Sequence, residues 1–237
     1  MTRITVKPPV DAPPDVPAKS SAADIAKFVQ TARQVAAEPG GRLVFALDAT
    51  MSRQPTWDRA CEIQASMFDA AGQTSGLAVQ LVFFRGHGEC KASKWVTNPQ
   101  ALSSVMTGIQ CRGGTTQISK VLTHTAKEHQ KNKVAALVFI GDAMEENVDV
   151  LCQKAGELGI QGVKAFMFQE GLDAPTETAF REIARLTHGA YMRLDENSAA
   201  QLRELLKAVA AYAVGGQQAL QHQTGKSAQA LLEQLKP

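Results

Sequence analysis

From residue 43 onward, short runs of consecutive apolar residues alternate with longer segments in which apolar residues recur at helical spacing. The apolar runs cover residues 43–47, 77–84, 134–140, 162–168 and 190–194. Runs without polar alternation are typical of strands that are covered on both faces of a parallel sheet. Helices are expected at residues 56–71, 98–109, 116–129, 145–158, 175–186 and 198–214. This alternation predicts a mostly parallel sheet with helices on both faces.

A turn at Gly86-His87-Gly88 interrupts the alternation and leads into a shorter, more polar strand at residues 89–95. The two strands predict a hairpin at the edge of the sheet. The expected fold class is therefore α/β, a Rossmann-like three-layer α/β/α arrangement with a mostly parallel central sheet and one antiparallel edge strand. In such sheets ligands bind beyond the carboxyl ends of the strands, so functional residues are expected there.

Both ends of the chain differ from the part between them. Residues 1–18 are rich in proline and predict a disordered arm, and residues 19–38 predict an N-terminal helix. The α/β domain is expected to occupy residues 41–214. A tail rich in Gln and Ala follows at residues 215–237. The tail contains the spacing of one short helix, for which we predict no docking position.

The composition narrows the classes of function. The 237 residues carry a formal net charge of +2, and Lys and Arg are dispersed, so neither a nucleic-acid nor a membrane-binding surface is indicated. The chain contains no apolar stretch of the roughly 18 residues that a membrane span requires, and no apolar core of a signal peptide. The four cysteines lie far apart, which favours reduced thiols in a cytoplasmic protein over disulfides or a zinc site.

Carboxylates and hydroxyls gather in three segments, two of which directly follow predicted strands. The segments are Asp48-Ala49-Thr50-Met51-Ser52, Gly113-Gly114-Thr115-Thr116 and Asp142. In an extended loop, alternate residues project to one side, so Asp48, Thr50 and Ser52 are expected to converge. The paired glycines allow a sharp turn that presents a hydroxyl at the start of a helix.

All of these groups offer oxygen, which suits Mg²⁺, Mn²⁺ or Ca²⁺ better than Zn²⁺ or copper. Mg²⁺ keeps water molecules wherever the protein supplies too few ligands, so one coordination position would stay open. An Asp or Glu carboxylate from another molecule is the natural ligand for that position.

The set Asp48-x-Thr50-x-Ser52, Thr115 and Asp142 resembles the metal-ion-dependent adhesion site of von Willebrand factor A domains, whose motif is D-x-S-x-S with a distant Thr and a distant Asp. The resemblance covers residues 41–214 and implies a Rossmann-like fold that binds a partner protein through one divalent cation, without catalysis. It implies that Ser52 and Thr115 contact the metal directly, and that Asp48 and Asp142 do so directly or through water.

The chain departs from the family pattern at two positions. Thr50 replaces the first motif Ser and keeps its hydroxyl, and Ala143 replaces the Gly that often follows the distant Asp. Thr116 is a possible substitute for Thr115. Residues 48–58 are similar to stand-alone cytoplasmic bacterial members of the family, some of which are associated with tellurite resistance.

Three alternatives remain open at this point. The aspartates and hydroxyls could only form turns and helix caps. The sheet could carry a Mg²⁺-dependent hydrolase or nucleotide site, or a structural interaction domain with a degenerate metal site. A phosphatase with a nucleophilic Asp48 is disfavoured, because Thr50 stands where a general acid is needed.

The residues around the predicted metal form a possible rim for partner contact. This rim consists of Met51, Arg53, Trp57, Met144, Glu145 and Glu146. For Glu145 and Glu146, a simpler interpretation is that they lie in the first turn of the following helix, where acidic residues interact favourably with the helix dipole.

Overall fold

The computed structural model divides into two compact units, Met1–Ala36 and Ala37–Pro237. It describes residues 41–53, 77–98, 101, 104–106, 108–194, 199–221, 229 and 232–235, all within the second unit. The predicted arm at 1–18 and the predicted helices at 19–38 and 56–71 lie outside the described residues.

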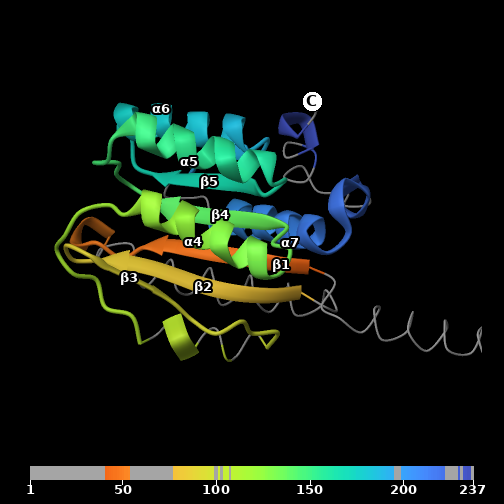
Figure 1. Ribbon diagram of the computed structural model, residues 1–237, viewed down its shortest axis with the longest axis horizontal. Helices are drawn as coiled ribbons and strands as arrows, with labels where there is room; N and C mark the ends of the chain where they lie inside the picture. The colour runs from red at the N-terminus through yellow and green to blue at the C-terminus, as the bar shows by residue number, and fades with distance from the viewer. Residues whose placement is uncertain are drawn as a thin grey trace, which may run out of the picture. The chain divides into compact units, whose positions relative to one another are not determined.

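A six-stranded sheet forms the centre of the described part of the chain, in the order β3-β2-β1-β4-β5-β6 (Figure 1). Its strands are β1 (Gly41–Asp48), β2 (Leu77–Arg85), β3 (Glu89–Ala92), β4 (Ala136–Gly141), β5 (Lys164–Glu170) and β6 (Ala190–Leu194). Neighbouring strands are parallel except for the β2–β3 hairpin at one edge. The predicted α/β fold class with one antiparallel edge strand is confirmed.

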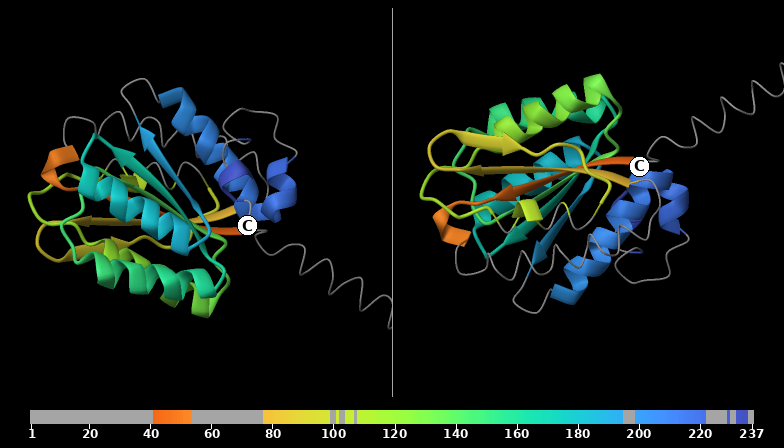
Figure 2. Two further views of the ribbon diagram at one scale, coloured as in Figure 1. Left: turned by 90° about the horizontal axis from the view of Figure 1, so that it is seen from above. Right: turned by 90° about the horizontal axis from the view of Figure 1, so that it is seen from below.

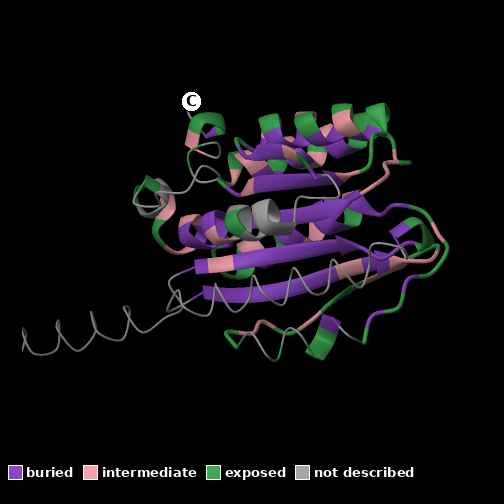
Figure 3. Ribbon diagram, turned by 180° about the vertical axis from the view of Figure 1, so that it is seen from behind, coloured by how far each residue is buried: buried purple, intermediate pink, exposed green. Residues whose placement is uncertain are grey.

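Helices cover both faces of this sheet, as the views along it show (Figure 2). The helices α4 (Ile118–Lys131), α5 (Val148–Ile160) and α6 (Ala174–Leu186) cover one face, and α7 (Ala199–Gln221) covers the other. The central strands are mostly purple when the ribbon is coloured by burial (Figure 3), because their faces meet a helix layer on both sides, whereas no residue of the edge strand β3 is buried. This double burial explains the uninterrupted apolar runs of the sequence.

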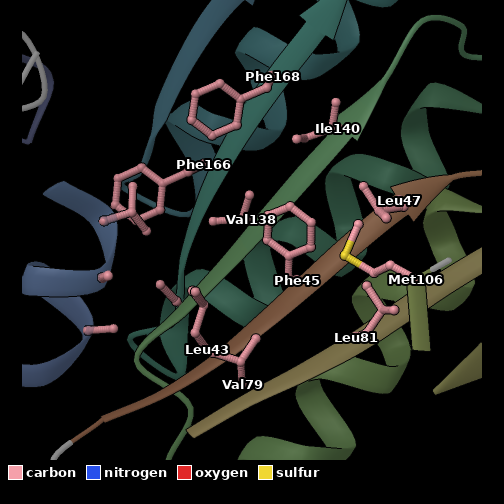
Figure 4. Packing of buried hydrophobic residues seen from close by; sticks show 14 of the residues in the cluster. Leu43, Phe45, Leu47, Val79, Leu81, Met106, Val138, Ile140, Phe166 and Phe168 are labelled. Carbon is pink, nitrogen blue, oxygen red and sulfur yellow. The ribbon is translucent and has the colours of Figure 1, made fainter. Parts of the chain in front are cut away.

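Alternate residues of each central strand belong to opposite cores. Phe45 and Leu47 of β1 pack with Val138 and Ile140 of β4 on the α7 side (Figure 4). Val44 and Ala46 face the layer of α4, α5 and α6 instead. Burying a large apolar side chain contributes about 1.5–3 kcal/mol, so these two layers hold β1 and β4 firmly in register.

That register determines where the strand-end residues lie. Leu47 of β1 is opposite Ile140 of β4, so Asp48 and Gly141 end adjacent strands at the same edge of the sheet. A Cβ placed on Gly141 would lie 3.5 Å from the Cβ of Asp48. Asp142 therefore follows directly beside Asp48.

Some boundaries differ from those predicted. The edge strand β3 ends at Ala92 rather than at 95, although the main chain of Val96 still exchanges hydrogen bonds with Val79 of β2 at 2.8 and 2.9 Å. The helix expected from residue 145 begins at 148, because the side chain of Asn147 accepts a hydrogen bond from Val150 N and caps α5 there. The last helix, predicted to end near residue 214, continues to Gln221 but is kinked at Gly216, whose φ of 64° and ψ of −156° are not helical.

The C-terminal tail docks, although we predicted no position for it. Leu235 is buried in the core on the α7 side, with Leu232 packed against it. The side chain of Gln234 accepts a hydrogen bond of 3.1 Å from the main-chain N–H of Tyr191 in the edge strand β6. The tail thus pairs one donor that an edge strand would otherwise expose. No helix in the described part of the chain combines the length and the apolar character of a membrane span.

Candidate metal centre

The first segment is a tight turn at the end of β1. Asp48 is fully buried, and its Oδ1 accepts a hydrogen bond of 2.7 Å from the main-chain N–H of Thr50. Thr50 O then accepts from Arg53 N at 3.1 Å, which closes the 3-10 turn η1 (Met51–Arg53). The expectation of an extended loop is therefore wrong. The turn still brings the hydroxyls of Thr50 and Ser52 together, with Oγ1 and Oγ 3.1 Å apart.

A buried ion pair holds this turn from the side of β5. Arg53 donates from Nε and Nη2 to the carboxylate of Glu170, at 3.1 and 2.6 Å, and from Nη1 to the carbonyl of Asp48 at 3.0 Å. Its side chain has a relative exposure of 0%. Arg53 was expected to contribute to a rim for partner contact, and that expectation is wrong. Its guanidinium is needed inside to satisfy the carbonyl of Asp48 and the carboxylate of Glu170.

The second segment runs beside the first. Arg112 N donates to the carbonyl of Ala49 at 3.1 Å, and the main chain of Thr50 bridges that of Arg112. Gly114 lies against the hairpin turn: a Cβ at this position would be 2.1 Å from the carbonyl oxygen of Gly86. Only glycine permits this approach, which places Thr115 beside the hairpin turn, within hydrogen-bond distance of Gly86 O.

The two threonines of this segment have different environments. The hydroxyl of Thr116 is buried and accepts a hydrogen bond of 3.0 Å from Glu145 N. Thr115 is exposed, and its main-chain N–H donates to Gly86 O at 3.3 Å, while its hydroxyl makes no hydrogen bond with the residues that the structure describes. The structure thus engages Thr116 in holding the fold, which leaves Thr115 as the better candidate ligand.

The third segment places a second carboxylate beside the first. Within the described part of the chain, Oδ2 of Asp48 and Oδ1 of Asp142 are buried and have no hydrogen-bond partner. Burial raises the pKa of Asp48 to about 6. Hydrogen bonding by Thr50 opposes this rise, the negative charge of Asp142 adds to it, and the positive charge of Arg53 opposes it. Buried carboxylates with orphaned oxygens are groups whose burial a bound cation would offset.

Glu145 and Glu146 do not lie in the first turn of α5, so that interpretation is wrong. They reach across to the N-terminus of α4. Glu146 accepts hydrogen bonds from the main-chain N–H groups of Ile118 and Ser119, the latter at 3.0 Å. Glu145 accepts from Thr116 N at 3.1 Å. Nothing in the local sequence indicates this, because the partners are 27 to 29 residues away.

The donor set fits a hard divalent cation. The described residues contain no group of three or more His, Cys, Asp and Glu that could hold a metal, so such a site depends on hydroxyls as well as on the two carboxylates. Asp48, Asp142, Ser52 and Thr115 come from three adjacent segments at one end of the sheet, with Thr50 hydrogen-bonded to Ser52 (η1 is orange at the left in Figure 1). Carboxylate and hydroxyl oxygens are ligands that Mg²⁺, Mn²⁺ and Ca²⁺ accept.

The fold is similar to that of several solved structures. Among solved structures, the chain is similar to a von Willebrand factor type A protein from Catenulispora acidiphila, with a TM-score of 0.61 and 16% identity over 74% of this chain and 43% of that one. It is also similar to the ArnB paralog VWA2 from Sulfolobus acidocaldarius, with a TM-score of 0.52 and 14% identity over 73% of this chain and 45% of that one.

A third similar structure is the pilus adhesin SpaC from Lactobacillus rhamnosus GG, in an open conformation, with a TM-score of 0.61 and 11% identity over 74% of this chain and 30% of that one. The chain spans less than half of the length of each of these three proteins. No family model and no curated protein matches the sequence. The similarities show that the chain has a von Willebrand factor A-like fold.

Proposed function

We propose that this chain, whose fold is that of von Willebrand factor A domains, is a metal-dependent binding module that performs no catalysis. It holds one divalent cation, Mg²⁺ or else Mn²⁺ or Ca²⁺, with Asp48, Thr50, Ser52, Thr115 and Asp142. The cation binds an Asp or Glu side chain of a partner protein. The dispersed charge and the reduced state expected of the cysteines support a cytoplasmic setting.

One observation supports this proposal above the others. Two carboxylate oxygens, Asp48 Oδ2 and Asp142 Oδ1, are buried without a hydrogen-bond partner among the described residues, and the charge of Asp142 acts on Asp48. Burying an unpaired carboxylate costs several kcal/mol, and two neighbouring ones repel each other. A turn former or a helix cap would use its oxygens on N–H groups. These two oxygens are left over, which disfavours the interpretation as turns and caps alone.

The coordination of the ion explains why a partner carboxylate would complete the site. Two carboxylates neutralise the charge of one divalent ion, and the hydroxyl ligands add no charge. Arg53 lies close enough to influence Asp48, but its guanidinium is paired with Glu170, so these two side chains add no net charge. An incoming Asp or Glu then meets a divalent ion that has an open coordination position. The similarity to a protein described as a pilus adhesin agrees with a binding role.

The first test measures the melting temperature Tm without metal and at concentrations of Mg²⁺ or Mn²⁺ that rise in roughly 10-fold steps. A cation at about 100 times its dissociation constant stabilises the folded state by about 2.7 kcal/mol. We expect a rise in Tm for the wild type and none for Asp48→Asn or Asp142→Asn. Asp149→Asn is the matched control, since it removes the same charge from an exposed position in the first turn of α5. An unchanged wild-type Tm with both metals, or equal shifts in all four proteins, would refute the metal site.

The second test concerns the partner. Proteins captured by the wild type are compared with those captured by Asp48→Asn and by the wild type in the presence of a chelator. The proposal expects the same proteins to be lost in both perturbations and retained by Asp149→Asn. A subsequent scan of Asp and Glu in the captured partner should find one carboxylate whose amide variant abolishes binding. Partners that survive both perturbations would contradict the role of the metal.

A further inference from the structure

We propose that Glu145 and Glu146 are positioning residues that fasten the Thr115 segment to the Asp142 segment, so that these two of the three segments of the metal centre move as one body. This inference rests on the proposed function, because it gives the two glutamates the role of fixing the distance between the metal ligands Thr115 and Asp142. It concerns two glutamates that do not belong to the metal-ligand motif.

Helix α4 provides no cap for its own N-terminus. Its N-cap residue Gln117 makes no side-chain capping hydrogen bond, and its first turn has no acidic residue. The first N–H groups of a helix need acceptors, and a negative charge there is favourable. Glu146 supplies both from a different loop, by accepting from the N–H groups of Ile118 and Ser119. The carboxylate therefore acts as the cap of a helix to which it does not belong.

A second contact makes the connection reciprocal. The side chain of Glu145 accepts from the main-chain N–H of Thr116 at 3.1 Å, and its own N–H donates to the hydroxyl of Thr116 at 3.0 Å. This is the arrangement of a capping box, but formed between two separate segments. Together, four hydrogen bonds link residues 116–119 to residues 145 and 146.

This link lies close in the chain to two of the candidate metal ligands. Thr115 directly precedes Thr116, and Asp142 lies three residues before Glu145. Asp142 directly follows β4, and the link ties the segment that carries Thr115 to the loop after Asp142, so the link limits how far the two candidate ligands can move apart. A binding site loses its geometry when its ligands shift by about 0.5 Å, which a loosened loop would allow. Thr116, considered at first as a ligand, serves instead as an anchor.

The experiment measures Mn²⁺ affinity by titration calorimetry and, separately, hydrogen exchange of the metal-free protein. Glu146→Ala removes the cap, and Glu146→Gln keeps one acceptor oxygen without the charge. Asp149→Asn controls for the loss of one negative charge near the site. Glu128→Ala controls for destabilisation of α4, because Glu128 accepts from Trp95 Nε1 at 2.7 Å near the opposite end of the same helix.

We expect Glu146→Ala to weaken Mn²⁺ binding about ten-fold, which corresponds to about 1.4 kcal/mol, the size of a lost helix cap. Glu146→Gln should lie between Glu146→Ala and the wild type, and the two controls should bind Mn²⁺ almost as the wild type does. In metal-free Glu146→Ala, the amides of Ile118 and Ser119 and those of residues 142–144 should exchange faster together.

The two readouts separate this inference from the proposed function. If the wild type binds Mn²⁺ and Glu146→Ala binds it equally well, the positioning role is refuted while the metal site stands. If the wild type binds no Mn²⁺, the proposed function fails, and hydrogen exchange alone decides whether the link exists. Faster exchange at Ile118 and Ser119 without any change at 142–144 would overturn the inference in either case.

Discussion

Replacing Arg53 with methionine tests whether the turn after β1 depends on the ion pair with Glu170. The Arg53 side chain has a relative exposure of 0%, whereas that of Glu170 has 20%. Removing one member of a fully buried ion pair costs about 3–5 kcal/mol. Because Glu170 keeps some contact with water, we expect Arg53→Met to lower the free energy of unfolding by about 2–3 kcal/mol.

Replacing the other partner of the ion pair should lower the free energy of unfolding by more. Glu170→Gln leaves a wholly buried cation in place, so we expect a loss of about 3–4 kcal/mol. The double variant Arg53→Met/Glu170→Gln should lose at least about 1 kcal/mol less than the two single losses added together, because neither charge then remains without the other.

The assay is urea unfolding at neutral pH, followed by far-ultraviolet circular dichroism. Lys207→Met is the control, since its ion pair with Glu204 is exposed, with side-chain exposures of 40% and 53%. That pair should contribute less than about 1 kcal/mol. If Arg53→Met destabilises no more than Lys207→Met does, or if the losses in the double variant simply add, the ion pair between the turn after β1 and β5 does not stabilise the fold.

Three further predictions concern separate parts of the fold. Gly114→Ala would force a Cβ to within 2.1 Å of Gly86 O, so we expect a loss of about 1–3 kcal/mol and weaker Mn²⁺ binding; an unchanged urea midpoint would show that the segment has room to move. Asp173→Ala removes the cap of α6 and should cost about 1 kcal/mol at pH 7. Hydrogen bonds from Thr176 lower the pKa of Asp173, so this loss should be full above its ordinary pKa of 3.8 and disappear as the pH falls through the lower folded value; a loss that persists at the lowest pH would contradict the assignment. Leu235→Ala should cost about 2 kcal/mol, because Leu235 of the tail is buried in the core; an unchanged melting curve would contradict the docking of the tail.

The sheet could be predicted from the sequence because its signal is local. Each central strand is one apolar run, and the run at 43–47 needs no knowledge of its neighbours to be assigned as a buried strand. The positions of Asp48 and Asp142 follow from the same logic, since both come directly after such runs in a parallel sheet. The strands and the residues at their ends were therefore accessible from the sequence, whereas the order of the strands in the sheet comes from the structure.

The parts that failed depend on contacts between distant segments. Glu146 in the first turn of a predicted helix is explained equally well by that helix, and only the structure shows that it caps α4. Arg53 in a polar loop is expected at the surface, and only its distant partner Glu170 accounts for its burial. Gln234 lies in a tail of low complexity, where nothing predicts a hydrogen bond to the edge strand. Long-range polar pairing leaves no periodic pattern along the chain.

The most direct test of the central claim is the position of Mn²⁺ in crystals of the wild type, located by its anomalous scattering. The account predicts one peak at the carboxyl ends of β1 and β4, coordinated by Asp48 and Asp142 directly or through water, and in contact with the hydroxyls of Ser52 and Thr115. In crystals grown with Mg²⁺ instead, the metal–oxygen distances should be about 2.1 Å. A peak elsewhere, or no peak in crystals grown with an excess of Mn²⁺, would contradict the account.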